Sequence, residues 1–499
     1  MVVSMSHPMA VSVSHLHPTV EGLERVARDL RSVYGGGKTK AYDWRVSQLK
    51  ALLKLTTHHE TEIIEALRSD LNKPELEAFV HEVHGVKSSC RLALKELHRW
   101  MLPERVETSR INFPSSAEIV PEPLGVVMVL SLDPVVGALA AGNAVVLKPS
   151  EIAPATSSLL SELLGKYMDT SAVKVVEGGV PETTALLEQK WDKIFYTDEW
   201  RHVSEHRVYP LGNSTVGRII LTAAAKHLTP VVLELGGKCP VVVDSNIDIK
   251  VAARRIIAGK WGCNNGQTCI APDYVITTKE YASELIDVFS SELEKFYGND
   301  PLQYKDLSRI INSRHFDRLK RLLDDKRVSG KVVIGGQSDK ANLKIAPTVV
   351  LDAPKDFLVL YFPLSRFLLH WKIHVDRIED SIGLINSKGK PLAAYLFTND
   401  KKLKEEFIGS VSAGGMVIND TIVHVIERNL PFGGVGESGM GAYHGKYSFD
   451  TFSHKKAVLQ RGSVDVDLIY PPFTPLKVKL LKAIITGDIL GIPRALIGW

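Results

Sequence analysis

The sequence predicts an α/β fold built from two parallel-sheet domains, and three observations lead to this prediction. Apolar strand-like runs alternate with amphipathic helical segments over residues 125–235, and the alternation repeats over residues 241–418. The chain has 499 residues, which exceeds what one hydrophobic core usually organises. Its 44% hydrophobic and 24% charged residues are typical of globular domains.

The first half of the chain combines helices with a first set of strands. Apolar residues at helical spacing predict N-terminal helices at 20–34, 41–57, 61–71 and 76–100. After a short strand at 117–120, strands are expected at 125–130, 144–147, 173–176, 193–196 and 231–235, with helices at 154–167, 182–188 and 216–227. Because these strands are apolar throughout, they indicate a parallel sheet covered on both faces. Such sheets bind cofactors at the carboxyl ends of their strands.

The second half repeats the pattern and predicts a second sheet. Strands are expected at 241–243, 274–277, 331–334, 393–397 and 415–418, and helices at 249–261, 280–297, 313–325 and 377–385. A second run of alternating strands and helices indicates a second α/β domain.

Cys269 is the first candidate catalytic residue. It lies in a polar run, Trp261–Gly–Cys–Asn–Asn–Gly–Gln–Thr–Cys–Ile–Ala–Pro272, between a helical segment and an apolar strand. Gly266 allows the backbone to bend, so the amides of residues 267–270 can point toward one oxygen. A reactive thiol needs partial exposure, which a polar loop provides. A small residue filling a gap in the core is the alternative role.

Glu234 is the second candidate. It ends a β-branched run that begins at Val231, and Gly236 and Gly237 follow it after Leu235. A carboxylate beside flexible backbone can move as a general base must, whereas a salt-bridged or capping glutamate is the alternative. One predicted helix, at 249–261, separates Glu234 from Cys269, so both side chains can fold onto a common cleft.

Five ordered motifs together resemble a known family. They are Glu122–Pro–Leu–Gly125, Gly142–Asn–Ala–Val–Val–Leu–Lys–Pro–Ser–Glu151, Lys226–His–Leu–Thr–Pro–Val–Val–Leu–Glu–Leu–Gly–Gly237, Asn265–Gly–Gln–Thr–Cys269 and Pro431–Phe–Gly–Gly–Val–Gly–Glu–Ser–Gly–Met–Gly441. From about Gly22 to Gln460 the chain resembles the aldehyde dehydrogenase superfamily, and within it the class 3, fatty-aldehyde-type branch. The resemblance implies an aldehyde dehydrogenase-like α/β fold with two Rossmann-like parallel-sheet domains and a small bridging β arm.

The resemblance also implies a division of the chain. Residues 17–109 and 124–234 would form the cofactor-binding domain, and 235–428 the catalytic domain. Residues 110–123 and 429–460 would form the bridging arm through which the family dimerises, so a homodimer is expected. Residues 461–499 would form a C-terminal tail that is basic and amphipathic.

The activity implied is oxidation of medium- or long-chain aliphatic, or aromatic, aldehydes to carboxylic acids with NAD or NADP. Cys269 would be the nucleophile and Glu234 the base. Lys148 and Glu151, just past a predicted strand end, would contact the adenosine side of the cofactor. The turn that opens the helix near 216 would face the pyrophosphate, because helix N-termini favour anions. The cofactor-binding set is completed by Gly212, Asn213, Ser214, Thr215, Val216, Gly217 and Gly236.

One literal G-x-G-x-x-G motif, Gly434–Val–Gly–Glu–Ser–Gly439, has a different interpretation. It follows Leu430–Pro–Phe432 rather than a strand, and more glycine follows it instead of an amphipathic helix. It therefore lacks the context of a dinucleotide fingerprint, and an active-site loop is expected.

Three stretches depart from the family pattern. After Ser131 the chain passes directly to Leu132–Asp–Pro134, as if about nine residues carrying a Trp–Asn–(Tyr or Phe)–Pro motif were absent; its Asn supplies the family's side-chain oxyanion donor. Residues 198–211 are an insertion before the glycine turn. Residues 356–371 contain no Glu–x–Phe–Gly–Pro signature. The intact flanks of all three favour changes at exon boundaries or reading frames over gradual drift.

These departures leave a second hypothesis open. The chain could be a catalytically impaired or silent homologue that acts only as a dimer partner. A cofactor-independent thiol hydrolase is a third option, which the recognisable Lys148 and Gly212 regions disfavour.

The net charge and the cysteine pattern limit which binding partners and which cellular location are expected. The net charge of +4 comes from dispersed basic residues, which argues against nucleic acid. Four cysteines without C-x-x-C spacing indicate no metal site and a reducing compartment. Residues 1–19 contain no Lys or Arg, so a cytoplasmic location is expected, with a plastid or the endoplasmic-reticulum membrane surface as alternatives.

The C-terminal tail suggests a further contact. Lys477, Lys479 and Lys482 are mixed with aliphatic residues, but the apolar run is too interrupted to span a bilayer. Peripheral membrane contact and dimer capping both remain open.

Overall fold

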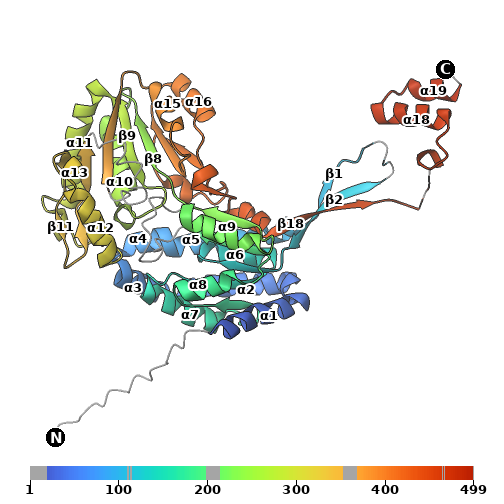
Figure 1. The fold of residues 1–499 in the computed structure, drawn as a ribbon, viewed down its shortest axis with the longest axis horizontal. Coiled ribbons are helices and arrows are strands. Elements are labelled where there is room, and N and C mark those ends of the chain that lie inside the picture. The colour runs from blue at the N-terminus through green and yellow to red at the C-terminus, as the bar shows by residue number, and fades with distance from the viewer. Residues whose placement is uncertain are drawn as a thin grey trace, which may run out of the picture.

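The computed structural model describes residues 19–109, 115–197, 214–351, 368–463 and 467–497, together with 112 and 465. Two bodies, each with its own parallel sheet, lie beside one another, and a thin antiparallel arm projects away from them (Figure 1). The C-terminal helices lie at the far end of that arm. The two-sheet α/β architecture predicted from the sequence is therefore confirmed.

The first sheet has the strand order β17-β7-β6-β3-β4-β5. Its strands are β3 (Val126–Val129), β4 (Ala144–Leu147), β5 (Val173–Val175), β6 (Lys193–Thr197), β7 (Val231–Glu234) and β17 (Gly439–Met440). All neighbours are parallel except β17, which runs antiparallel to β7. The chain moves outward from β3 to β5 and then returns to β6 on the other side of β3. Ligands of open α/β sheets bind at such a reversal, beyond the carboxyl ends of the strands.

Helices cover both faces of this sheet, as continuous apolar strands require. Val127 and Val129 belong to one buried cluster and Val126 and Met128 to another, because alternate side chains point to opposite faces. One face is covered by α1 (Val20–Gly35), α8 (Val180–Leu187) and α9 (Ser214–Ala225). The other is covered by α2 (Tyr42–His58), α3 (Glu60–Leu71), α5 (His84–Met101), α6 (Asp133–Ala141) and α7 (Pro154–Tyr167).

The helix expected at 76–100 is interrupted. The structure has α4 (Glu75–Ala78), a π-helical turn at Phe79–Val83 and then α5. A π turn holds one residue more than an α turn, so apolar spacing alone does not reveal it, and such turns often lie at functional sites.

The second sheet has the order β10-β13-β14-β9-β8-β15-β16. Its strands are β8 (Cys239–Val243), β9 (Pro272–Thr278), β10 (Val332–Ile334), β13 (Thr348–Leu351), β14 (Leu368–Val375), β15 (Ala393–Phe397) and β16 (Gly415–Ile418). β13 and β14 were not expected from the sequence. β14 begins inside the stretch that departs from the family pattern. Its helices are α10 (Ile249–Trp261), α11 (Lys279–Tyr297), α12 (Ser313–Asp324), α13 (Lys326–Ser329), α15 (Asp380–Asn386) and α16 (Lys401–Ser410), and a small hairpin joins β11 (Ser338–Asp339) to β12 (Lys344–Ile345).

The arm is a three-stranded antiparallel sheet of β1 (Glu104–Val106), β2 (Ser116–Pro123) and β18 (Ser453–Gln460) (Figure 1). Before it, α17 (Gly445–Thr451) packs on α6, where a Cβ at Gly137 would lie 2.5 Å from the Cβ of Ser448. Beyond it lie α18 (Pro475–Thr486) and α19 (Gly491–Leu496). These helices and the residues next to them expose several large apolar side chains, among them Phe473, Ile485, Ile489, Leu490, Leu496 and Ile497. No helix within the described ranges is long and apolar enough to cross a membrane.

Asn143 ties the arm to the first sheet. Its side chain is fully buried, and its Oδ1 accepts from the backbone N–H of Gly125 at 2.9 Å. Its Nδ2 donates to the carbonyls of Ala138 (3.2 Å) and Phe452 (2.9 Å). One amide therefore joins the start of β3, the end of α6 and the residue before β18.

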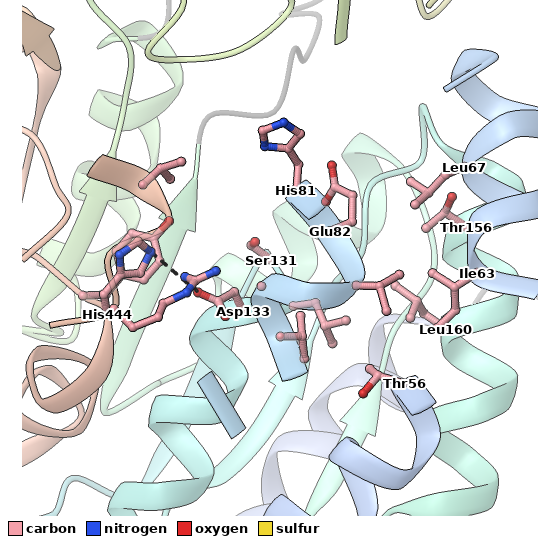
Figure 2. Close-up of a pocket in the computed structure, with 17 residues that line it drawn as sticks. Thr56, Ile63, Leu67, His81, Glu82, Ser131, Asp133, Thr156, Leu160 and His444 are labelled. Carbon is pink, nitrogen blue, oxygen red and sulfur yellow. Dashed lines mark hydrogen bonds and ion pairs between the residues drawn. The ribbon is translucent and has the colours of Figure 1, made fainter. Parts of the chain in front are cut away.

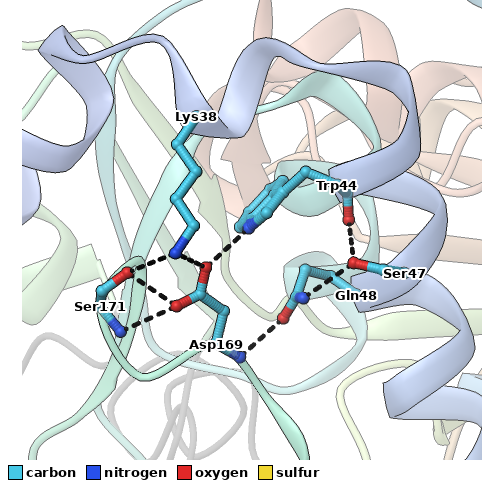
Figure 3. Close-up of polar contacts among 6 residues, drawn as sticks. All are labelled: Lys38, Trp44, Ser47, Gln48, Asp169 and Ser171. Carbon is cyan, nitrogen blue, oxygen red and sulfur yellow. Dashed lines mark hydrogen bonds and ion pairs between the residues drawn. The ribbon is translucent and has the colours of Figure 1, made fainter.

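A second polar cluster fixes α2 against the loop before β5 (Figure 3). The Asp169 carboxylate pairs with Lys38 at 2.6 Å and accepts from Trp44 Nε1 at 2.8 Å and Ser171 Oγ at 2.7 Å. Its backbone N–H donates to Gln48 Oε1 at 2.8 Å. Partial burial opposes the charge, but these donors outweigh it and lower the pKa of Asp169 from 3.8 to about 2.

This depressed pKa predicts an acid-sensitive contribution to stability. The folded state favours the ionised Asp169, so its contribution is present above about pH 4 and is lost as the pH falls toward 2. The Asp169→Asn variant should melt at a lower temperature than the wild type at pH 7, and the difference should shrink between pH 4 and pH 2. Calorimetry across that range checks this, with Asp287→Asn, at an exposed position of α11, as control. A difference that stays constant with pH would contradict the assignment.

Candidate active site

The loop that presents Cys269 begins where α10 ends. Asn264, Asn265 and Gly266 have φ values of 50°, 50° and 85°, so three consecutive residues adopt the left-handed conformation. Glycine and asparagine are the residues that tolerate this conformation best. The chain therefore turns sharply after α10 and approaches β9 with Cys269 three residues before the strand.

Side-chain amides fix this loop to its surroundings. Asn265 is fully buried and its Nδ2 donates to the carbonyls of Ser308 (3.1 Å) and Ile345 (3.3 Å). Gln267 Nε2 donates to the carbonyls of Asn264 (2.9 Å) and Arg309 (3.0 Å). Bonds from one loop to separate segments of the second body hold its backbone in one conformation.

Cys269 is the most accessible of the four cysteines. It is partly exposed, whereas Cys90, Cys239 and Cys263 are buried. Burial raises the pKa of the Cys263 thiol to about 11 and that of Cys90 further still. Those two thiols are unsuited to nucleophilic chemistry at neutral pH, which leaves Cys269 in the better environment.

Glu234 lies at the junction between the two sheets. It ends β7, pairs with Thr197 of β6 and Gly439 of β17, and is buried. Beyond it, a Cβ at Gly237 would lie 2.8 Å from the backbone Cα of Pro391, so only glycine fits there. The second sheet then begins at Cys239, which pairs with Pro272 of β9. Its Sγ contacts the carbonyl of Cys269 at 3.6 Å.

Tyr443 is buried and held edge-on against Phe195, with ring centroids 5.0 Å apart. Burial raises the pKa of its phenol well above 10, and the charges of Glu234, Asp133 and Cys269 raise it further. The link between the two candidate catalytic segments is Cys239, which follows Glu234 by five residues and whose Sγ contacts the carbonyl of Cys269 at 3.6 Å.

The cofactor candidates gather at the carboxyl edge of the first sheet. Lys148 directly follows β4, is fully buried and pairs with Glu151 at 2.5 Å. Ser214, Thr215 and Val216 form the first turn of α9, which leads from β6 to β7. A Cβ at Gly217 would lie within 3.4 Å of the side chains of Leu233 and Leu235. A buried ammonium and a helix N-terminus beside the strand reversal fit the diphosphate and ribose of a dinucleotide. Gly236 lies buried between Glu234 and Gly237.

Some predicted features lie outside the described residues. These are Gly212, Asn213, the insertion at 198–211 and residues 356–367 of the third departing stretch. Among the residues that the structure does describe, no group of three or more metal-ligating side chains could hold an ion.

The shortened connection after β3 is visible in the structure. Residues 130–132 alone join β3 to α6, and Ser131 and Leu132 line a cavity of about 220 Å³ (Figure 2). A neighbouring cavity of about 180 Å³ is also lined by Ser131 and Leu132. The absent segment would have followed Ser131, so both cavities lie next to the place from which it would have projected.

Four residues around the larger cavity were not singled out from the sequence: Asp133, Arg428, Tyr443 and His444. Asp133 accepts from Arg428 Nη1 at 3.0 Å, and His444 Nε2 lies 3.8 Å from the same carboxylate (Figure 2). Burial lowers the pKa of His444 to about 4, so this histidine is neutral at pH 7. Tyr443 and His444 lie just after the last recognised motif, which ends at Gly441. That position in the sequence was the signal that could have identified them.

Comparison with known proteins identifies relatives over nearly the whole chain. A model described as the aldehyde dehydrogenase family matches residues 37–458. An aldehyde dehydrogenase of Craterostigma plantagineum is 60% identical over 486 residues, covering 95% of this chain and 98% of the relative. The chloroplastic aldehyde dehydrogenase family 3 member I1 of Arabidopsis thaliana is 56% identical, with 94% and 85% covered. A dimeric NADP-preferring aldehyde dehydrogenase of Rattus norvegicus is 41% identical, with 89% and 96% covered.

A solved structure agrees with these relatives. The substrate-bound state of Staphylococcus aureus AldH matches with a TM-score of 0.86 at 36% identity, covering 92% of this chain and 99% of that one. The resemblance inferred from the five motifs is confirmed. This chain belongs to the aldehyde dehydrogenase family, on its family 3 branch, whose oxidoreductases use NAD or NADP.

Proposed function

We propose that this chain oxidises medium- or long-chain aliphatic, or aromatic, aldehydes to carboxylic acids, with Cys269 as nucleophile and Glu234 as general base. The observation that carries the proposal is the contact at 3.6 Å between Cys239 Sγ and the carbonyl of Cys269, because Cys239 follows Glu234, the last residue of β7, by only five residues. A partly exposed thiol and a buried carboxylate supply the two groups that the reaction needs.

The residues act in sequence. The Cys269 thiolate attacks the aldehyde carbonyl, and backbone N–H groups of the rigid loop before it are available to the developing oxyanion. When bound, the nicotinamide ring accepts the hydride of the resulting thiohemiacetal. Glu234 then removes a proton from water, the hydroxide attacks the thioester carbonyl, and the carboxylic acid leaves as the thiolate reforms. The glycines beside Glu234 let its side chain move between these stages.

Cofactor binding is assigned to the carboxyl edge of the first sheet. Lys148 and Glu151 would contact the adenosine ribose. The segment from Gly212 to Gly217 would contact the pyrophosphate, and Gly236 would allow close approach of the nicotinamide side. The same assignment makes residues 17–109 and 124–234 the cofactor domain and 235–428 the catalytic domain, which the two separate sheets support.

The absent segment lowers the expected rate. Without the Asn-bearing stretch, oxyanion stabilisation depends on backbone amides, and the loss of one side-chain donor typically costs about 100- to 1000-fold in turnover. A silent homologue acting only as a dimer partner is the alternative. The comparisons do not favour it, since the identity to aldehyde dehydrogenases extends over nearly the full chain.

The arm and tail suggest partners and location. We propose that the exposed β2–β18 sheet forms a homodimer, as the dimeric rat relative supports. The exposed apolar residues in and around α18 and α19, together with the exposed Lys479 and Lys482, would permit peripheral membrane contact. The chain would act in the cytoplasm, with a plastid as the alternative because of the chloroplastic relative. No nucleic-acid partner is expected.

The two catalytic residues should fail at different stages. Cys269→Ser should abolish reduction of NAD or NADP. Glu234→Gln should lower steady-state turnover by about 100-fold or more while retaining one rapid turnover per site, because only thioester hydrolysis needs the base. Rapid-mixing absorbance of the reduced cofactor with an aliphatic aldehyde distinguishes these results. Loss of the rapid first turnover in Glu234→Gln would contradict this role.

Restoring the absent segment should restore the rate. Insertion of about nine residues carrying Trp–Asn–Tyr–Pro between Ser131 and Leu132 should raise kcat by about 100-fold. The same insertion with Ala in place of Asn is the matched control, because it fills the cavity without supplying the donor. Equal rates for the two insertions would show that packing, rather than oxyanion stabilisation, was lost.

A further inference from the structure

Two buried charges lie beneath the loop that carries Cys269. Lys73 is fully buried, and its Nζ pairs with Glu82 and lies 3.7 Å from Glu77 Oε1. The Glu77 side chain is 8% exposed. Burial lowers the pKa of Lys73, but its pairing with Glu82 and Glu77 outweighs burial and raises that pKa above its ordinary value. The ammonium is therefore charged throughout the neutral range.

Glu77 joins this pair to the nucleophile loop. Its Oε1 accepts from the backbone N–H of Asn264 at 2.6 Å, and its Oε2 accepts from Ser308 Oγ at 3.3 Å. Asn264 is the first of the three left-handed residues that reverse the chain after α10. Ser308 in turn supplies the carbonyl that receives Asn265 Nδ2. The Glu77 carboxylate therefore binds Asn264, the first residue of the turn, directly. It also binds Ser308, which in turn contacts Asn265, the second residue of the turn.

The negative charge of the Glu77 carboxylate affects the strength of the hydrogen bond that it accepts from Asn264. A hydrogen bond from a backbone N–H to a carboxylate is roughly twice as strong as one to a neutral acceptor. An isolated carboxylate at this depth would tend to take up a proton, and burial does raise the pKa of Glu77 while the Lys73 charge opposes the rise. The buried lysine therefore offsets part of the cost of placing a carboxylate at the point where the loop is held.

We propose that Glu77, which lies 3.7 Å from the buried Lys73 ammonium, is a positioning residue that sets the presentation of the Cys269 thiol by holding the backbone N–H of Asn264. This inference rests on the proposed function and deepens it, since Glu77 acts through the loop and touches neither substrate nor cofactor. Without the acceptor, a buried N–H loses its partner in a turn of three left-handed residues. The loop would then sample other conformations, and Cys269 would spend less time in its reactive position.

A purely structural role for Glu77 predicts something different. It would change the fraction of folded chains and the melting temperature, but each folded chain would retain a normally reactive thiol. A positioning role changes the rate constant per folded chain. The decisive measurement is therefore the reactivity of Cys269 itself, normalised to the folded fraction.

The test uses the full-length chain without cofactor or aldehyde. Iodoacetamide alkylation of Cys269 is followed by mass spectrometry of its peptide in the wild type, Glu77→Leu and Glu77→Gln. Glu77→Leu should slow alkylation about tenfold, because the N–H loses its acceptor. Glu77→Gln should recover most of the rate, because its amide oxygen can still accept. Ser308→Ala is the matched control: it removes the other hydrogen bond of the same carboxylate but spares Asn264, and should alkylate at the wild-type rate.

Turnover gives a second readout. In aldehyde oxidation, Glu77→Leu should lower kcat with little change in KM, since the substrate contacts are untouched. A Glu77→Leu variant that alkylates at the wild-type rate per folded chain would overturn the proposal, as would an equal loss in Ser308→Ala. If Glu77→Leu does not fold, Glu77→Asp replaces it with the same expectations, because it keeps the charge but shortens the reach. A wild type inactive toward aldehydes would refute the proposed function, while the alkylation series would still decide this inference.

Discussion

The close contact of backbones at the end of β7 is the constraint on which the rest of the site depends. Gly439 pairs with Glu234, and a Cβ there would lie 2.1 Å from the carbonyl oxygen of Leu233. A Cβ at Gly237 would lie 2.8 Å from the Cα of Pro391. Neither position accepts a side chain, and the chain passes from the first sheet to the second within a few residues. Glu234, the proposed base, thereby ends one sheet shortly before Cys239, whose Sγ contacts the carbonyl of Cys269 at 3.6 Å.

Most of this architecture follows from the sequence. Apolar strands alternating with helices gave both sheets, and the order of motifs around Glu234 and Cys269 pointed to a shared region. The left-handed turn at Asn264 was not predictable, because asparagine occurs in many other conformations. Tyr443 was missed because an aromatic residue among apolar neighbours is usually interpreted as a core residue. The charged groups that act on its phenol become apparent only in the structure. The contact of Glu77 with Asn264 joins residues far apart in the chain, which no local pattern encodes.

The departures from the family pattern affect the fold and the chemistry differently. The flanks of the shortened connection stay in place because β3 and α6 are held by the buried core and by Asn143. A strand still forms across part of the third departing stretch, since β14 pairs in parallel with both β13 and β9. The fold tolerates these changes. Oxyanion stabilisation does not, because it depends on single atoms at fixed positions.

The hollow beside Ser131 and Leu132 also has a consequence for hydration. Pockets of about 220 and 180 Å³ that open to the surface have room for ordered water. The shortened connection therefore lets solvent approach the end of β3, at a place that the absent segment would have covered.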